Sequence, residues 1–195
     1  MKLNNSGPAI FMYIVIGVTL LVAIICFGLY YLDINTNKIV LWSGITAFTI
    51  MYHLWLRIIF GNISRAFQAK LKYTQKWFKE RKFEPSIYKM LKVKKWKDKA
   101  LTYNPELFSL KDYSLEEVAN TMCKAEVDHW INEIISLSTI AFGLIWGKTW
   151  IFVITAICAC VFDAQFIVIQ RYNRPRIVRV LAKKNNNKKV TGNNS

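Results

Sequence analysis

Three ionisable side chains in the stretch KAEVDHWINEI (124–134) have the types and spacing that general acid–base catalysis requires. Glu126, His129 and Glu133 are three and four residues apart, so a helix would carry them on one face. A carboxylate that hydrogen-bonds to one imidazole nitrogen makes the other nitrogen more basic. We predict that His129 is a catalytic base, and we rank Glu126 above Glu133 as the residue that orients its ring. The competing interpretation is an interfacial charge cluster paired with nearby lysines.

The same stretch raises the question of a metal site. Glu-x-x-His on a helix is half of the ligand set of di-iron bundles, which need a second such helix and two further Glu residues. The chain contains only two histidines, and His53 follows no Glu at that spacing. We therefore predict no metal site and no tightly bound cofactor.

A second group of ionisable residues lies within apolar segments, where such side chains are costly and usually functional. His53 and Arg57 are four residues apart and would share a helix face. Asp163 lies at a similar depth in a later apolar segment, and its pairing with Arg57 or His53 is a hypothesis for the interior of a bundle. His53 or Arg57 would then stabilise a developing oxyanion.

Arginines cluster in the stretch QRYNRPR (170–176) and just after it. Because the planar guanidinium suits bidentate phosphate binding, we predict that Arg171, Arg174 and Arg176 hold the phosphates of coenzyme A or the acidic surface of acyl carrier protein. Anchoring by positive charge at a membrane surface is the alternative. The remaining substrate-binding candidates are Tyr172, Asn173, Trp130 and Trp96.

The elements that position these residues are predicted to be membrane helices. Apolar residues make up 53% of the 195-residue chain, yet its formal net charge is +15. Four mostly apolar segments are long enough to cross or nearly cross a bilayer: residues 9–32, 39–60, 130–146 and 149–169. We therefore predict an all-α fold, a polytopic membrane helix bundle with about four transmembrane helices plus cytoplasmic interfacial helices.

Lys and Arg residues indicate the orientation. Residues 61–128 hold 15 of the 27 basic residues and the chain after Gln170 holds eight, whereas the connections at 33–38 and 147–148 hold one each. Positive residues stay in the cytoplasm, so segment 61–129 and both termini are predicted to be cytoplasmic in a multi-pass protein of the cell membrane. This rule and contacts with anionic lipids account for the charge, and no recognised motif supports nucleic-acid binding.

The cytoplasmic segment has two predicted parts. Residues 62–83 mix aromatic and basic side chains as an interfacial helix does, and Pro85 is predicted to end that helix; residues 88–101 have a similar composition. The sequence SLEE at 114–117 is a capping box, and no Gly or Pro lies between it and Phe142, so one helix is predicted to run from Ser114 into the third membrane segment. Residues 1–184 would form one integral membrane domain, and residues 185–195 a disordered tail.

Three stretches of the chain resemble a known family: KKWKDK (94–99), AEVDHW (125–130) and IVIQRYNRPR (167–176). They are similar to the glycosyl-4,4'-diaponeurosporenoate acyltransferases of staphyloxanthin-type carotenoid biosynthesis. The resemblance covers roughly residues 90–180. It implies a small integral membrane protein that esterifies a sugar hydroxyl of a glycosylated carotenoid with a fatty acyl group, and it assigns no catalytic residue.

Taken together, these patterns predict a membrane acyltransferase. It would move a fatty acyl group from a thioester donor, either acyl-CoA or acyl carrier protein, to a hydroxyl of an amphiphilic acceptor such as a glycolipid or glycosyl-carotenoid. Its partners would be membrane lipids, this acceptor and this donor. Two alternatives stay open: a small membrane lipid methyltransferase or reductase, although the chain has no glycine-rich nucleotide loop, and a non-enzymatic scaffold, transporter subunit or immunity-type protein.

Overall fold

The computed structural model describes residues 7–100 and 108–192, and the described part of the chain consists of helices joined by turns, without a β-strand. The long helices are α1 (Gly7–Tyr31), α2 (Lys38–Phe67), α5 (Leu115–Ser138) and α7 (Thr149–Gly192). The shorter ones are η1 (Gln68–Lys70), η2 (Lys76–Phe78), α3 (Glu84–Met90), α4 (Val93–Trp96), η3 (Lys97–Lys99), η5 (Thr139–Ala141) and α6 (Phe142–Trp146). The all-α prediction is confirmed.

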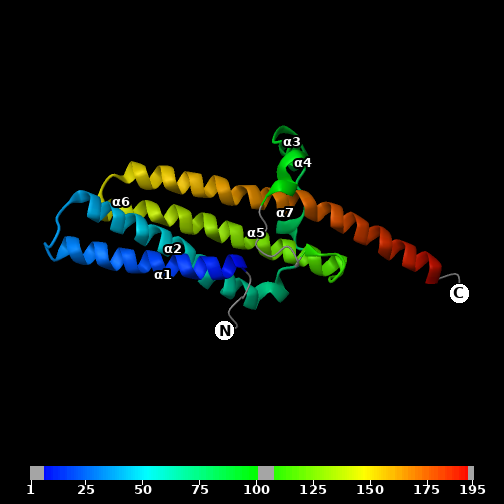
Figure 1. Ribbon diagram of the computed structural model, residues 1–195. Helices are drawn as coiled ribbons and strands as arrows, with labels where there is room; N and C mark the ends of the chain where they lie inside the picture. Colours follow the sequence, from blue (N-terminus) through cyan, green and yellow to red (C-terminus); the bar gives the residue numbers. More distant parts are fainter. Residues whose placement is uncertain (1–6, 101–107, 193–195) are drawn as a thin grey trace.

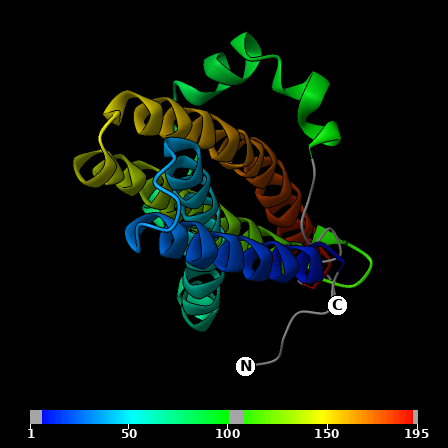
Figure 2. The ribbon, with the colours of Figure 1, turned by 60° about the vertical axis from the view of Figure 1, so that its left-hand side comes forward.

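The long helices lie side by side in a bundle (Figures 1 and 2), with α5 packed on α7 and on α2, and α1 packed on α2. Successive helices run in opposite directions because short turns join α1 to α2 and α6 to α7 at one end of the bundle. In both views α3 and α4 lie outside the bundle, at the level of its other end. This arrangement brings the middle of α2, α5 and α7 together.

Within the described residues, three helices are long and apolar enough to cross a membrane: Ile10–Tyr31, Lys38–Lys70 and Thr149–Asn187. They correspond to three of the four predicted membrane segments. The remaining segment, 130–146, is helical along α5, η5 and α6 and lies beside the others (Figure 1). It does not form one long apolar helix, because α5 is polar over its first half and ends at Ser138, after which the segment continues as η5 and α6.

The start of α5 is the capping box that the sequence predicts. The Ser114 Oγ accepts a hydrogen bond from the Glu117 backbone N–H at 3.2 Å, and Glu117 Oε2 accepts one from the Ser114 N–H at 2.8 Å. These bonds satisfy N–H groups that a helix start leaves without partners. The helix then continues past residue 130 to Ser138, which confirms a single helix that enters the third predicted membrane segment.

The prediction of an interfacial helix at residues 62–83 is wrong. Helix α2 runs on to Phe67, and the chain then forms only the 3₁₀ turns η1 and η2, with extended backbone at Leu71 between them. Contacts with the bundle replace helical hydrogen bonds here: the Tyr73 N–H donates to Asn120 Oδ1 at 3.0 Å, and the Phe78 carbonyl accepts from Arg174 Nε at 3.0 Å.

Pro85 begins a helix rather than ending one. It occupies the first turn of α3, where a missing N–H costs no helical hydrogen bond. The basic segment that follows folds as the short helices α3, α4 and η3, while residues 101–107 lie outside the described residues. At the other end of the chain α7 continues as a helix to Gly192, through most of the tail predicted to be disordered, because no Gly or Pro interrupts residues 177–191.

A close contact between α6 and α7 holds the turn at residues 147–148. A Cβ atom on Gly143 would lie 2.7 Å from the Cα of Thr149, so only glycine allows the two backbones to approach this closely. Gly147 has φ +76°, which suits glycine in the turn. The turn directs α7 back along α5 and thereby aligns Asp163 with His129.

Candidate functional site

A cluster of polar side chains surrounds Asp163 in the interior of the bundle. Asp163 on α7 has no exposed surface. Its Oδ1 lies 2.9 Å from Nδ1 of His129 and accepts a hydrogen bond from Asn132 Nδ2 at 3.2 Å. Its Oδ2 accepts one from Arg57 NH2 at 2.5 Å. We call Arg57, His129, Asn132 and Asp163 the Asp163 cluster; it connects α2, α5 and α7.

The cluster determines which nitrogen of His129 carries the proton. A carboxylate only accepts hydrogen bonds, so Nδ1 of His129 is the donor to Asp163, and in the neutral imidazole Nε2 then holds the lone pair. The ring stacks on Phe166 with 4.7 Å between centroids, and the side chain remains 23% exposed. Nε2 makes no hydrogen bond to any residue that the structure describes, which leaves it available to a substrate.

Asp163 therefore takes the orienting role that the sequence assigned to Glu126 or Glu133. The predicted pairing of Asp163 with Arg57 is present in the structure. His53 instead lies half-buried one turn from Arg57, and its ring is nearly perpendicular to that of Tyr52, with 6.2 Å between the centroids. Glu133 is half-buried on α5, and its backbone carbonyl accepts a weak bond from the Cys160 thiol at 3.8 Å.

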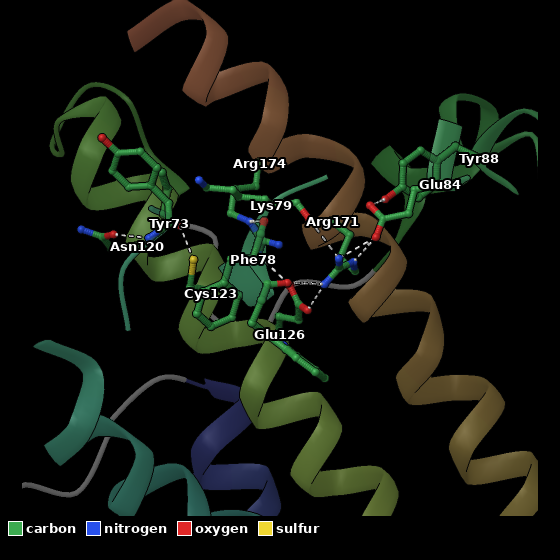
Figure 3. A network of polar contacts seen from close by, with 12 residues as sticks. Tyr73, Phe78, Lys79, Glu84, Tyr88, Asn120, Cys123, Glu126, Arg171 and Arg174 are labelled. Carbon is green, nitrogen blue, oxygen red and sulfur yellow. Dashed lines mark hydrogen bonds and ion pairs between the residues drawn. The ribbon is translucent and has the colours of Figure 1, made fainter. Parts of the chain in front are cut away.

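Glu126, three residues before His129 on α5, belongs to a separate network (Figure 3). It is fully buried. Its Oε1 lies 2.6 Å from NH1 of Arg171, and its Oε2 lies 2.6 Å from NH1 of Arg174. Arg171 also contacts Glu84 of α3 through NH2 at 2.5 Å and Nε at 2.9 Å. We call Glu84, Glu126, Arg171 and Arg174 the Glu126 network; its two carboxylates balance its two guanidinium groups.

The Glu126 network attaches helix α3 and the 77–84 segment to the bundle. Figure 3 shows Arg171 between Glu126 and Glu84, so that one guanidinium joins α5, α7 and α3. The Tyr88 hydroxyl donates to Glu84 at 2.8 Å, and burial together with this bond raises the pKa of Tyr88 well above its ordinary value. Removing one member of such a buried ion pair leaves the other charge buried without a counter-charge, which destabilises the fold. The phosphate contacts predicted for Arg171 and Arg174 are thus replaced by internal ion pairs.

The other substrate-binding candidates lie around this network or on the surface. Arg176 is exposed and its guanidinium lies over the ring of Tyr172, 3.5 Å from the centroid. Tyr172 is buried and packs edge-on against Tyr88 at 5.4 Å. Trp96 packs against the cluster formed by Tyr88, Val93 and Tyr172, and its Nε1–H donates to the Leu91 carbonyl at 2.9 Å. Asn173 is half-buried and Trp130 is exposed.

A cavity of about 370 Å³ opens beside the Glu126 network. The residues that line it come from the 73–80 segment and α7: Tyr73, Thr74, Phe78, Lys79, Glu80, Arg174, Pro175, Val178 and Arg179. A larger groove of about 590 Å³ lies between α1 and α2, near Lys38 and Lys148. No residue of the Asp163 cluster or the Glu126 network lines that groove, so the groove is separate from the candidate site.

Sequence reasoning missed three contributors to the site. Asn132 is three residues from His129 on the same helix face, and this spacing was an available signal. Phe166 is three residues from Asp163, which was a weaker one. Glu84 carried no local signal, because its contact with Arg171 joins residues 87 positions apart.

The fold and the two clusters define a helical protein with membrane-spanning helices and buried ionisable groups in its interior. A sequence model of the glycosyl-4,4'-diaponeurosporenoate acyltransferase family matches residues 74–183, which is more than half of the chain. The chain belongs to this family, whose name describes acyl transfer in a carotenoid pathway, and the resemblance seen in the sequence is confirmed. No curated protein and no solved structure matches the chain. The matched range includes His129, Asp163 and the whole Glu126 network, whereas Arg57 precedes it.

Proposed function

We propose that the protein transfers a fatty acyl group from a thioester donor to a hydroxyl of an amphiphilic acceptor, a glycolipid or a glycosyl-carotenoid. The observation that carries this proposal is the hydrogen bond between His129 Nδ1 and buried Asp163. A carboxylate–imidazole pair of this kind raises the basicity of the distal nitrogen and stabilises the imidazolium that forms. Family membership supports acyl transfer as the reaction class.

The reaction needs one base and no cofactor beyond the donor. Nε2 of His129 removes the proton of the acceptor hydroxyl while its oxygen forms a bond to the thioester carbonyl carbon. The resulting tetrahedral oxyanion then collapses, the carbon–sulfur bond breaks, and the imidazolium returns the proton to the leaving thiolate. Throughout, Asp163 keeps its hydrogen bonds with Arg57 and Asn132.

Arg57 has a second role in this scheme. Its NH2 group binds Asp163, while its Nε is buried and has no hydrogen-bond partner among the residues that the structure describes. A buried, unsatisfied donor is costly. A developing oxyanion next to it would satisfy it only during the reaction, which is how such donors lower a barrier.

The location of the cluster suits two substrates of different solubility. We place segment 61–129 and both termini in the cytoplasm, with α1, α2, the α5–α6 segment and α7 crossing the cell membrane, because this arrangement keeps most Lys and Arg residues inside. His129 then lies near the cytoplasmic boundary. A water-soluble donor reaches it from the cytoplasm, and the acyl chain and the acceptor reach it from the lipid.

Lipid mass spectrometry of cells with and without the protein tests the proposal. An acylated glycolipid or glycosyl-carotenoid that disappears when the protein is removed supports it and names the acceptor. An unchanged set of lipids would contradict it and favour a non-enzymatic membrane protein.

A further inference from the structure

The cavity beside the Glu126 network has a positively charged lining. Lys79, Arg174 and Arg179 contribute three cations and Glu80 one anion. Arg174 is compensated by Glu126, and Arg179 contacts Glu80 at 2.7 Å. Lys79 is exposed, and its side chain makes no ion pair with any residue that the structure describes. The cavity thus has an uncompensated cation and no matching anion.

The ion pair between Arg179 and Glu80 is weak enough for another anion to replace Glu80 as the partner of Arg179. The side chain of Arg179 is 66% exposed, and exposed ion pairs contribute little free energy. An incoming phosphate, with more charge and more acceptor oxygens than a carboxylate, competes effectively for the guanidinium. Lys79 and Arg179 come from two different segments that both line the cavity, so an anion inside it has a cation available from each segment.

The distance between His129 and the cavity sets the length that a ligand needs to reach both. Asp163, which binds His129, and Arg174, which lines the cavity, are both buried on α7. Eleven residues separate them, which is about 16 Å along a helix and places them within about 20° on one face. By the same geometry Arg179 lies about 24 Å along the axis from Asp163 and about 160° around it, so the ligand must pass from one side of α7 to the other to reach Arg179. An extended pantetheine arm, which separates a thioester from its phosphate, covers a distance of this order.

We propose that this cavity binds the phosphate at the far end of the pantetheine arm of the thioester donor. The inference rests on the proposed function, because it takes the thioester to be held at His129. Coenzyme A and holo-acyl carrier protein share this phosphopantetheine chemistry and differ in the group attached to the other side of the phosphate. Lys79 and Arg179 are the ligand-binding cations, and Arg174 is a wall of the cavity fixed by Glu126.

Equilibrium dialysis with the purified full-length protein tests the inference without requiring turnover. The probes are coenzyme A, holo-acyl carrier protein and pantetheine, which lacks the phosphate. We expect Lys79→Gln to weaken binding of the phosphate-bearing ligand about tenfold, the effect of losing one charged hydrogen bond. We expect Glu80→Gln to strengthen it, because Arg179 is then released from its internal partner. Pantetheine binding should respond to neither substitution.

Lys82→Gln is the matched control, because Lys82 is an exposed lysine of the same segment that does not line the cavity. Tight binding of coenzyme A alone identifies the free coenzyme as the donor, and tight binding of the carrier protein alone identifies the protein-bound form. Equal binding of pantetheine and both phosphate ligands, or equal effects of Lys79→Gln and Lys82→Gln, overturns the inference. Phosphate-selective binding without acyl transfer overturns the proposed function only, and transfer without such selectivity overturns the inference only.

Discussion

His129 and Asp163 meet across the interface of α5 and α7, with 2.9 Å between Nδ1 and Oδ1. The same carboxylate binds Arg57 of α2, so that three helices converge on one buried acid. Asp163 therefore both orients the imidazole and holds the bundle together, two roles that substitutions can separate.

Asp163→Asn should abolish most activity while the bundle persists. The amide keeps the size of the carboxylate but stabilises the imidazolium poorly, so we expect the rate of acyl transfer to fall by about 10²–10⁴. The measurement is the initial rate of product formation by the purified protein, with folding checked by its thermal transition. Asp128→Asn is the control, because Asp128 is a neighbouring carboxylate that binds Ser64 and Lys124. Equal losses in both variants would show that the effect is not specific to Asp163.

Glu126→Ala should act on stability. The substitution leaves Arg174 without its buried counter-charge and Arg171 with Glu84 alone, and breaking a buried ion pair costs about 3–5 kcal/mol. We expect a lower midpoint of thermal unfolding in detergent and a smaller yield of folded protein. Glu133→Ala, on the same helix but outside the network, should change the midpoint little. If the Glu126→Ala protein had an unchanged midpoint and no activity, Glu126 would have a catalytic role rather than a structural one.

Gly143→Ala should loosen the turn between α6 and α7. The added Cβ would lie 2.7 Å from the Thr149 Cα, and such overpacking costs about 1–3 kcal/mol. The matched control is Gly61→Ala in α2, where a Cβ meets nothing within 4 Å. That change should be stabilising by about 0.5–1 kcal/mol, because alanine is the better helix former. Thermal unfolding of the two variants should therefore shift in opposite directions, and a shared direction would contradict the close contact.

The thiol of Cys123 should report on folding near the Glu126 network. Burial is the main cause that raises the pKa of Cys123 from its ordinary value of 9.0 to about 11, and the residue has no exposed surface. In a variant that keeps only this cysteine, alkylation by maleimide at pH 8 should be slow until denaturant is added. Glu116→Cys in a cysteine-free protein, at an exposed site of the same helix, should react at once. Fast alkylation of Cys123 in the native protein would contradict its burial.

The same shift predicts a dependence of stability on pH. A thiol whose pKa is higher in the folded state than in the unfolded state binds its proton more tightly when folded. Its contribution to stability is therefore complete below about pH 9 and is lost as the pH rises towards 11. Cys123→Ala should remove this part of the alkaline loss of stability in denaturant titrations. An unaltered alkaline profile would show that the thiol does not contribute.

Local patterns in the sequence predicted the long helices of the bundle but not which side chains contact one another across it. The cap at Ser114 and the uninterrupted run to Phe142 predicted the course of α5, because both signals lie within one helix. The partner of His129 is 34 residues away, and sequence reasoning assigned Asp163 to Arg57 or His53 instead. One of these pairs exists, yet the carboxylate has two oxygens and binds both Arg57 and His129.

The arginines of α7 show the same limit. Arg171 and Arg174 follow an apolar helix in a basic stretch, which is typical of residues at a membrane surface. Their burial depends on the 73–88 segment folding back over α7, where Phe78 and Glu84 cover them. No periodicity marks that segment, because it consists of short turns fixed by contacts with the bundle. The prediction of one interfacial helix failed there for the same reason.

The most direct test of the account is the rate of acyl transfer by His129→Gln in lipid nanodiscs. Glutamine retains a hydrogen-bond donor for Asp163 but lacks a nitrogen that accepts a proton at neutral pH. The account predicts normal membrane insertion, an unchanged midpoint of thermal unfolding, and a rate lower by about 10²–10⁴. A variant that folds normally and transfers the acyl group at the rate of the unaltered protein would contradict the assignment of His129 as the base.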